Sequence, residues 1–109
     1  MVYRALMVLR MKPEDAEHVA AAFAEHDRTS LPDEIGVKRR FLFRFHDLYM
    51  HLVEADEDIM PKLYQAREHP LFQRVDQEVG RYLTPYSPQW RELKDSKAEV
   101  FYAWESDHA

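Results

Sequence analysis

Two positions in consecutive apolar segments, His51 and Arg40, carry side chains that are well suited to proton transfer. An imidazole exchanges protons near neutral pH, and a nearby guanidinium can stabilise negative charge that develops on an oxygen. His51 lies within the segment Leu48 to Glu54, and Arg40 lies within Val37 to Phe45. A histidine in the middle of a strand can also be a structural residue that hydrogen-bonds a cross-strand neighbour. Both interpretations of His51 stay open at this point.

A second histidine, His26, precedes Asp27 where a helical pattern ends. His26 continues the apolar stripe of Val19 and Phe23, so we expect it to face the packed side of the helix. A histidine oriented by a carboxylate is one interpretation, but adjacent helical residues diverge by about 100°, which argues against a direct His26–Asp27 pair. The structural alternative is a histidine favoured by the helix dipole, followed by a solvated aspartate.

A basic run in this acidic chain is the third candidate. Strand alternation places Lys38, Arg40 and Arg44 on one face. These cations form either a solvated edge or a binding surface for an enolate, a phenolate or a carboxylate. Trp104 shares a face with Tyr102 in a last apolar segment. It is either a core residue or part of the lining for a flat aromatic ligand.

The apolar periodicities predict the elements that must position these residues. We expect strands over 3–11, 37–45, 48–54 and 99–105, a helix over 13–28, and a helical pattern over 58–83 that is interrupted near His69 and Pro70. This β-α-β-β-α-β order is the ferredoxin-like arrangement of the α+β class. The chain shows no linker and no repeat, so residues 1–109 are expected to form a single domain.

The two central strands sort into two faces if His46 and Asp47 form a two-residue hairpin loop. We expect one face to pack against the helices: Phe41, Phe43, Phe45, Leu48, Met50 and Leu52. We expect the helices to leave the other face uncovered: Lys38, Arg40, Leu42, Arg44, Tyr49, His51 and Val53. A face this aromatic should either pack against a second subunit, which would enclose a cavity, or bind a flat ligand.

The composition excludes several kinds of site. The absence of cysteine rules out disulfides, thiolate nucleophiles and iron–sulfur clusters, and the two glycines are too far apart for a phosphate-binding loop. The six histidines form no HxH or HExxH motif, so we expect no metal. A net charge of −5 argues against nucleic acid as a partner. No apolar run approaches the roughly 20 residues of a membrane span, and we expect a cytoplasmic protein.

Several segments are similar to the tetracenomycin-type aromatic polyketide cyclases. The likeness covers nearly the whole chain, and FHDLYMHL at 45–52 is its specific block. The matching segments are YRALMVLRM at 3–11, HVAAAFAEHD at 18–27, EIGVKRRFLFRFHDLYMHLVEADEDIM at 34–60, HPLF at 69–72, YLTPY at 82–86 and LKDSKAEVFYAW at 93–104.

This resemblance implies a homodimer of ferredoxin-like protomers, a dimeric α+β barrel, and an enzyme that uses no cofactor. Such an enzyme folds a poly-β-ketone or a partly cyclised polyphenol, free or carried on an acyl carrier protein. It closes a ring by aldol addition and loses water to aromatise. The residues that line the substrate cavity in this family fall here on His51, Arg40, His26 and Asp27.

The resemblance also suggests a role for each of these side chains. Arg40 would stabilise enolate or alkoxide charge, His51 would shuttle the proton, and His26 with Asp27 would orient or protonate a ring oxygen. Four further residues would bind the substrate and shape the pocket: Tyr49, Arg44, Leu42 and Trp104.

Three other functions are compatible with a small domain of this kind. A cofactor-independent monooxygenase that acts on anthrone-like substrates also needs a pocket and a proton acceptor, and oxygen dependence would identify it. RNA-recognition domains share the element order, but the segment LYMHLVEA lacks the glycine and the paired aromatics of their third strand. A non-catalytic protein that binds an aromatic ligand is the third alternative.

Overall fold

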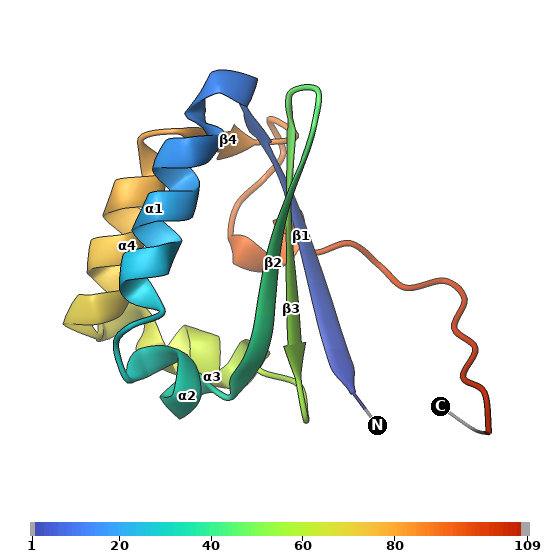
Figure 1. Cartoon of the computed structure of the whole chain (residues 1–109). Coiled ribbons are helices and arrows are strands. Elements are labelled where there is room, and N and C mark those ends of the chain that lie inside the picture. Colours follow the sequence, from blue (N-terminus) through green and yellow to red (C-terminus); the bar gives the residue numbers. More distant parts are fainter. Residues whose placement is uncertain (1, 108–109) are drawn as a thin grey trace.

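A single antiparallel sheet of four strands organises the computed structural model, which describes residues 2–107 (Figure 1). The strand order across the sheet is β2-β3-β1-β4. The strands are β1 (Tyr3–Met11), β2 (Val37–Phe45), β3 (Leu48–Ala55) and β4 (Leu83–Pro85). The strand order and the helix positions confirm the ferredoxin-like protomer of the α+β class.

Two helices, α1 (Ala16–His26) and α4 (Pro70–Gly80), lie side by side over one face of this sheet (Figure 1). Shorter elements fill the connections: η1 (Pro13–Asp15), α2 (Leu31–Ile35), α3 (Met60–Gln65), η2 (Ala66–Glu68) and η3 (Leu93–Ser96). His69 begins α4, because its ring Nδ1 accepts a hydrogen bond from the backbone N–H of Leu71 at 3.1 Å. Within residues 2–107, no helix is long and apolar enough to cross a membrane.

The β2–β3 hairpin has the predicted register. Phe45 pairs with Leu48, and Leu42 pairs with His51. His46 adopts a φ of 54°, in the left-handed region that a tight two-residue turn requires. A bulge between Val37 and Arg39 shifts the pairing only at the far end of the hairpin. His51 and Arg40 therefore lie on the same face, as the alternation predicts.

Our prediction of which hairpin face the helices cover was wrong. Tyr49, His51 and Val53 are 2%, 8% and 2% exposed, because α1 and α4 cover their face. The face that we expected to be covered carries Phe41, Phe43, Phe45, Leu48, Met50 and Leu52, and its phenylalanines are 45–60% exposed. We call this second face the open sheet face. Both faces carry enough apolar surface to pack, so the hand of the β1-α1-β2 crossover, which is nearly always right-handed, decides which one the helices cover.

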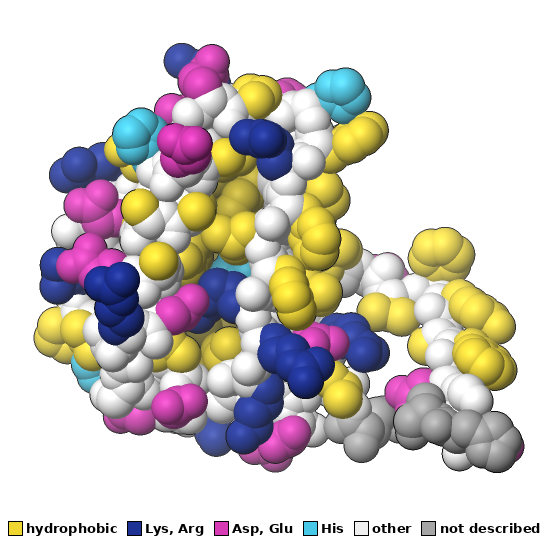
Figure 2. All heavy atoms as spheres, in the orientation of Figure 1, with side chains coloured by type: hydrophobic (Ala, Val, Ile, Leu, Met, Phe, Trp, Pro, Cys, Tyr) yellow, Lys and Arg dark blue, Asp and Glu magenta, His cyan; other side chains and the backbone are white. Residues whose placement is uncertain are grey.

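The predicted last strand at 99–105 was also wrong. The fourth position of the sheet is taken by β4, which pairs with Leu9, Arg10 and Met11. The chain touches β1 once more, where the N–H of Ala98 donates to the carbonyl of Leu6 at 2.7 Å, and then leaves the sheet. We call residues 97–107 the C-terminal tail. Its apolar side chains and those of the open sheet face gather on the side away from the helices (Figure 2). The segment meets the free edge of β1 only at Lys97 and Ala98, and from residue 99 to residue 107 it pairs with no strand, so its alternating pattern forms none.

Candidate active site

A cavity of about 320 Å³ lies between the two helices and the sheet, and we call it the central cavity. Most of its wall is apolar and comes from β1, β3, α3, α4 and the segment after β4. Eight side chains with polar groups interrupt this wall: His26, Arg40, Tyr49, His51, Asp76, Thr84, Trp90 and Ser96. A mostly apolar pocket with few polar groups is typical of a site for an organic ligand.

Arg40 and His51 are in direct contact in the wall of this cavity. The Nη1 of Arg40 lies 2.9 Å from the Nε2 of His51. Because a guanidinium can only donate, Nε2 must accept, and the neutral imidazole therefore carries its proton on Nδ1. That Nδ1–H donates to the hydroxyl oxygen of Tyr49 at 3.2 Å. The three side chains thus form a directed chain of hydrogen bonds from β2 to β3.

Asp27 holds the other side of the Arg40 guanidinium. The Nε of Arg40 lies 3.1 Å from both carboxylate oxygens, and its Nη2 lies 2.9 Å from Oδ1. Asp27 directly follows α1, whose C-terminal end lies over β2, so the helix brings the carboxylate to the arginine. A guanidinium has five N–H groups, of which these contacts and the bond to His51 use three. Two N–H groups are left to donate to an oxygen of a ligand.

Phe23 contacts both the guanidinium of Arg40 and the ring of His51 from the helix side. The Cζ of Arg40 lies 4.8 Å from the centroid of the Phe23 ring, within the range of a cation–π interaction. The His51 ring meets the same phenylalanine edge to face, with centroids 5.0 Å apart and planes at 67°. Arg40 is therefore preorganised by three neighbours, and its side chain is only 11% exposed.

Burial controls the protonation of His51 and Tyr49. Burial, and secondly the positive charge of Arg40, lower the pKa of His51 to about 3. The ring is therefore neutral at neutral pH, in agreement with its acceptor role toward Arg40. Burial also raises the pKa of Tyr49 well above its usual range, although the charge of Arg40 acts in the opposite direction. Tyr49 is thus a neutral hydroxyl that can donate its own proton into the cavity.

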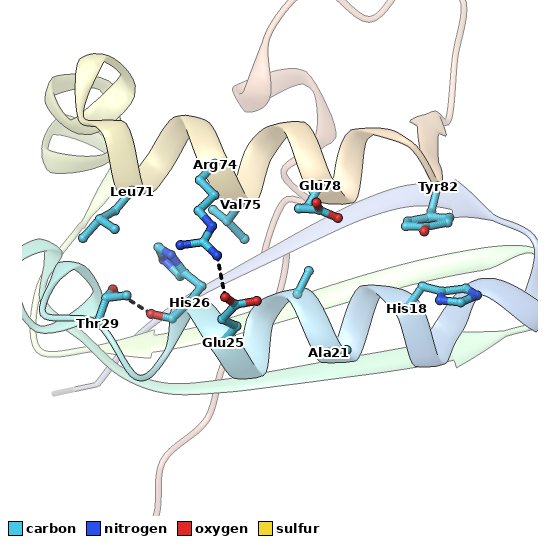
Figure 3. Close-up of a pocket in the computed structure, with 11 residues that line it drawn as sticks. His18, Ala21, Glu25, His26, Thr29, Leu71, Arg74, Val75, Glu78 and Tyr82 are labelled. Carbon is cyan, nitrogen blue, oxygen red and sulfur yellow. Dashed lines mark hydrogen bonds and ion pairs between the residues drawn. The ribbon is translucent and has the colours of Figure 1, made fainter.

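His26 lies on the packed side of α1, as its position in the apolar stripe predicts, and is 8% exposed. It does not pair with Asp27, whose carboxylate binds Arg40 instead. Burial, followed by the charge of Arg40, lowers the pKa of His26, while Asp27 raises it. His26 and Val75 line the central cavity and also a groove between α1 and α4. Figure 3 shows this groove, which the ion pair of Arg74 and Glu25 bridges.

The structure brings together the four residues predicted as catalytic, but only one of the four predicted to bind substrate. Tyr49 lines the central cavity with His51, Arg40 and His26. Leu42 and Arg44 line a different depression beside α1, and Arg44 donates to the carbonyl of Pro13 at 3.2 Å. Trp104 is 73% exposed in the C-terminal tail, because the strand expected to carry it does not form.

Four polar cavity residues were not predicted as site residues from the sequence: Ser96 in η3, Asp76, Thr84 and Trp90. Asp76 belongs to α4, Thr84 to the short strand β4, and Trp90 to the irregular segment that follows it. Of these residues, only Trp90 could have been noticed in the sequence, because it is an aromatic residue in a proline-rich stretch. Among residues 2–107, no group of three or more His, Asp or Glu side chains is arranged to hold a metal ion.

A family model, related sequences and a solved structure all match this chain over nearly its whole length. A family model for polyketide synthesis cyclases matches residues 3–105. The chain is 78% identical over 104 residues to tetracenomycin F2 cyclase of Streptomyces glaucescens, with 95% of each chain covered. It is 36% identical over 107 residues to the polyketide synthase CurG of Streptomyces cyaneus, covering 97% of this chain and all of that one. A solved structure of tetracenomycin F2 cyclase from Streptomyces glaucescens, described as a type-II polyketide cyclase, superposes with a TM-score of 0.92 at 77% identity. That match covers 95% of this chain and 98% of the other.

Proposed function

This chain belongs to the polyketide synthesis cyclase family and is an enzyme that cyclises aromatic polyketides, and we propose how its cavity does so. The substrate is a poly-β-ketone or a partly cyclised polyphenol. The observation that carries the proposal is the Arg40–His51 contact at 2.9 Å inside an apolar cavity, with Asp27 behind the arginine.

The proposed reaction is an intramolecular aldol addition followed by loss of water. A methylene between two carbonyls loses a proton, and its carbon attacks a ketone carbon of the same chain. The new carbon–carbon bond forms as the carbonyl becomes an alkoxide, which is protonated. The resulting hydroxyl then leaves as water with a neighbouring proton, and enolisation completes the aromatic ring. The balance needs no oxidant, which supports an enzyme that works without a cofactor.

In this reaction Arg40 stabilises negative charge and His51 accepts the proton. The two unused N–H groups of Arg40 stabilise the enolate or alkoxide oxygen. In the free enzyme the arginine charge lowers the basicity of His51, and an anionic oxygen bound to Arg40 neutralises that effect. Burial, the larger cause of the low pKa of His51, remains, so His51 becomes a better proton acceptor only by the share that the Arg40 charge had removed. To take the proton, its Nε2 must exchange the N–H of Arg40 for the substrate. Tyr49 and His26 are placed to donate to other oxygens of the same ligand.

Positioning is the larger part of the task, because a poly-β-ketone can close several different rings. An enclosed wall holds one conformation of the chain, so that one carbon meets one carbonyl. The sequence predicted a cavity enclosed between two subunits. The cavity instead lies under the helices of a single protomer. A single chain therefore supplies His26, Arg40, Tyr49 and His51 to the site.

Anaerobic turnover tests the proposed function. Incubation of the enzyme with a linear or partly cyclised polyphenol, without oxygen and with a chelator present, should give a product lighter by one water. His51→Gln keeps a neutral amide between Arg40 and Tyr49 and should lower kcat by about a hundredfold. His18→Gln, on the exposed side of α1, is the matched control. Strict dependence on oxygen would instead favour the monooxygenase alternative.

We also propose that the open sheet face forms a homodimer. Phe41, Phe43 and Phe45 are 45%, 49% and 60% exposed at alternate positions of one strand, and isolated proteins rarely leave such a row in water. Phe43→Lys should yield a monomer in sedimentation, whereas Glu78→Lys on α4 should leave the dimer intact. A monomeric wild-type protein would contradict this proposal. Presentation of the substrate on an acyl carrier protein and a cytoplasmic location stay predictions from the sequence.

A further inference from the structure

The wall of the central cavity reaches the protein surface at one place. Most residues of this wall are buried or half-buried. Within residues 2–107, the wall residues that are exposed to solvent are Asp76 and Gly80 of α4 and Thr84 and Pro85 of β4. β4 is the next element after α4 in the chain and packs against it (Figure 1). We call these four residues the mouth of the cavity.

The glycine in this mouth is not required by the backbone. Gly36, the other glycine of the chain, has a φ of 102° and therefore needs the freedom of a residue without a side chain. Gly80 is the last residue of α4 and does not have a positive φ. A Cβ at Gly80 would also have no atom of a neighbouring segment within 4 Å, so the protein has room for a side chain there. Because glycine weakens a helix, the open space beside Gly80 needs another explanation.

The mouth and the Arg40–His51 pair lie toward opposite edges of the sheet. β2, which carries Arg40, is one edge strand, and β4 is the other. Two strand intervals separate β3, which carries His51, from β4, and they correspond to roughly 10 Å at the usual strand spacing. A single ring held by Arg40 and His51 is therefore too short to reach the mouth, whereas a flat ligand of several fused rings extends to it.

We propose that Gly80 keeps the mouth wide enough for the outer ring of a flat, elongated polyphenol. This role rests on the proposed function, because such a substrate lies with one end at Arg40 and leaves its other end between α4 and β4. Val79 and Leu83, which adjoin the mouth in the sequence, give the cavity an apolar wall that suits the face of a ring. A side chain at position 80 would occupy the place of that ring. Gly80 is thus a specificity-determining residue that sets the length of the substrate that the cavity accepts.

Two ligands of different length test this role without turnover. A dihydroxyanthraquinone has three fused rings and catechol has one, and a chemical-shift titration measures the affinity of each. Gly80→Phe should weaken the binding of the dihydroxyanthraquinone about tenfold, through the lost burial of its outer ring, and leave that of catechol unchanged. Gln77→Phe, at an exposed position of α4 outside the cavity wall, is the matched control and should change neither affinity. Equal weakening of both ligands by Gly80→Phe, or no change in either, would overturn the proposal.

Gly80→Ala separates this role from a structural one. Alanine favours a helix over glycine, so Tm should rise by about 3 °C. The added methyl group narrows the mouth, so kcat/KM for a polyphenol of several fused rings should fall about threefold although the protein is more stable. A lower Tm would show that the backbone requires this glycine, and an unchanged kcat/KM in both Gly80→Ala and Gly80→Phe would show an open mouth without selectivity; either result would overturn the proposal. A wild-type protein that converts no polyphenol would refute the proposed function, and the two-ligand titration would still decide the role of Gly80.

Discussion

Acid should destabilise this protein through His51, because the fold buries that imidazole in its neutral form. The folded pKa of about 3 lies below the ordinary histidine value of 6.5. Between these two values the unfolded chain binds a proton that the folded chain does not bind. The free energy of unfolding is therefore fully retained above about pH 6.5 and falls as the pH falls toward 3.

The size of the effect follows from the two pKa values. At pH 5 the unfolded histidine is almost fully protonated, while the folded one is almost fully neutral. The difference in proton binding lowers the free energy of unfolding by about 2 kcal/mol between pH 8 and pH 5. This figure depends mainly on the unfolded pKa, so a folded pKa one unit higher would hardly change it. His26 adds to the slope in the same direction, since burial lowers its pKa as well.

Urea denaturation at pH 8 and pH 5, at one fixed protein concentration, measures this loss. The wild-type protein should lose at least about 2 kcal/mol, and His51→Gln should lose about 2 kcal/mol less over the same interval. His18 is exposed on α1, so His18→Gln should keep the wild-type loss. An equal loss in His51→Gln and in the wild type would refute the assignment of a buried neutral imidazole.

Three substitutions around the same pair have distinct expected outcomes. Arg40→Lys keeps a positive charge but loses the planar contact with both oxygens of Asp27, and kcat should fall about a hundredfold in a steady-state assay. Asp27→Asn removes the carboxylate behind the arginine while the cavity stays intact, so kcat should fall only about tenfold; complete loss of turnover in a folded variant would contradict a mainly positioning role. Tyr49→Phe leaves the Nδ1–H of His51 without an acceptor and should lower the free energy of unfolding by about 1–3 kcal/mol in urea.

The strands and the register of the hairpin could be predicted because they depend on local pattern. Side chains alternate with a period of two, and a two-residue loop at His46 and Asp47 leaves one register for both strands. That register alone placed Arg40, Tyr49 and His51 on one face. The contact between Arg40 and His51 at 2.9 Å is a consequence of it.

The position of the helices depends on the whole topology, so the same pattern failed to predict it. The phenylalanine-rich face is the more apolar one, and apolarity alone favours it as the buried face. The crossover from β1 through α1 to β2 instead places the helices on the face with Arg40 and His51. The arginine tolerates this burial because Asp27, at the end of α1, neutralises it there.

The ion pair between Asp27 and Arg40 could not be predicted from the sequence either. Sequence proximity suggests that Asp27 orients His26, and helix geometry argues against that pair without naming another partner. The end of α1 brings the carboxylate over β2, where Arg40 contacts it through Nε and Nη2. A contact between a helix end and a strand face requires the packed structure. Trp90 was missed for the same reason, since its segment reaches the cavity only through the position of β4.

The burial of the reactive face explains how a weakly basic histidine can serve in proton transfer. His51 would be a stronger base if it were solvated, but Arg40 would then interact with a substrate oxygen through water and at a high dielectric. Burial strengthens the interaction of Arg40 with an oxygen anion, and the same burial, followed by the charge of Arg40, depresses the pKa of His51 in the free enzyme. When the substrate oxygen becomes negative, it cancels the arginine charge that His51 experiences. Proton acceptance by His51 and charge stabilisation by Arg40 are therefore coupled events, and neither side chain should retain much catalytic effect without the other.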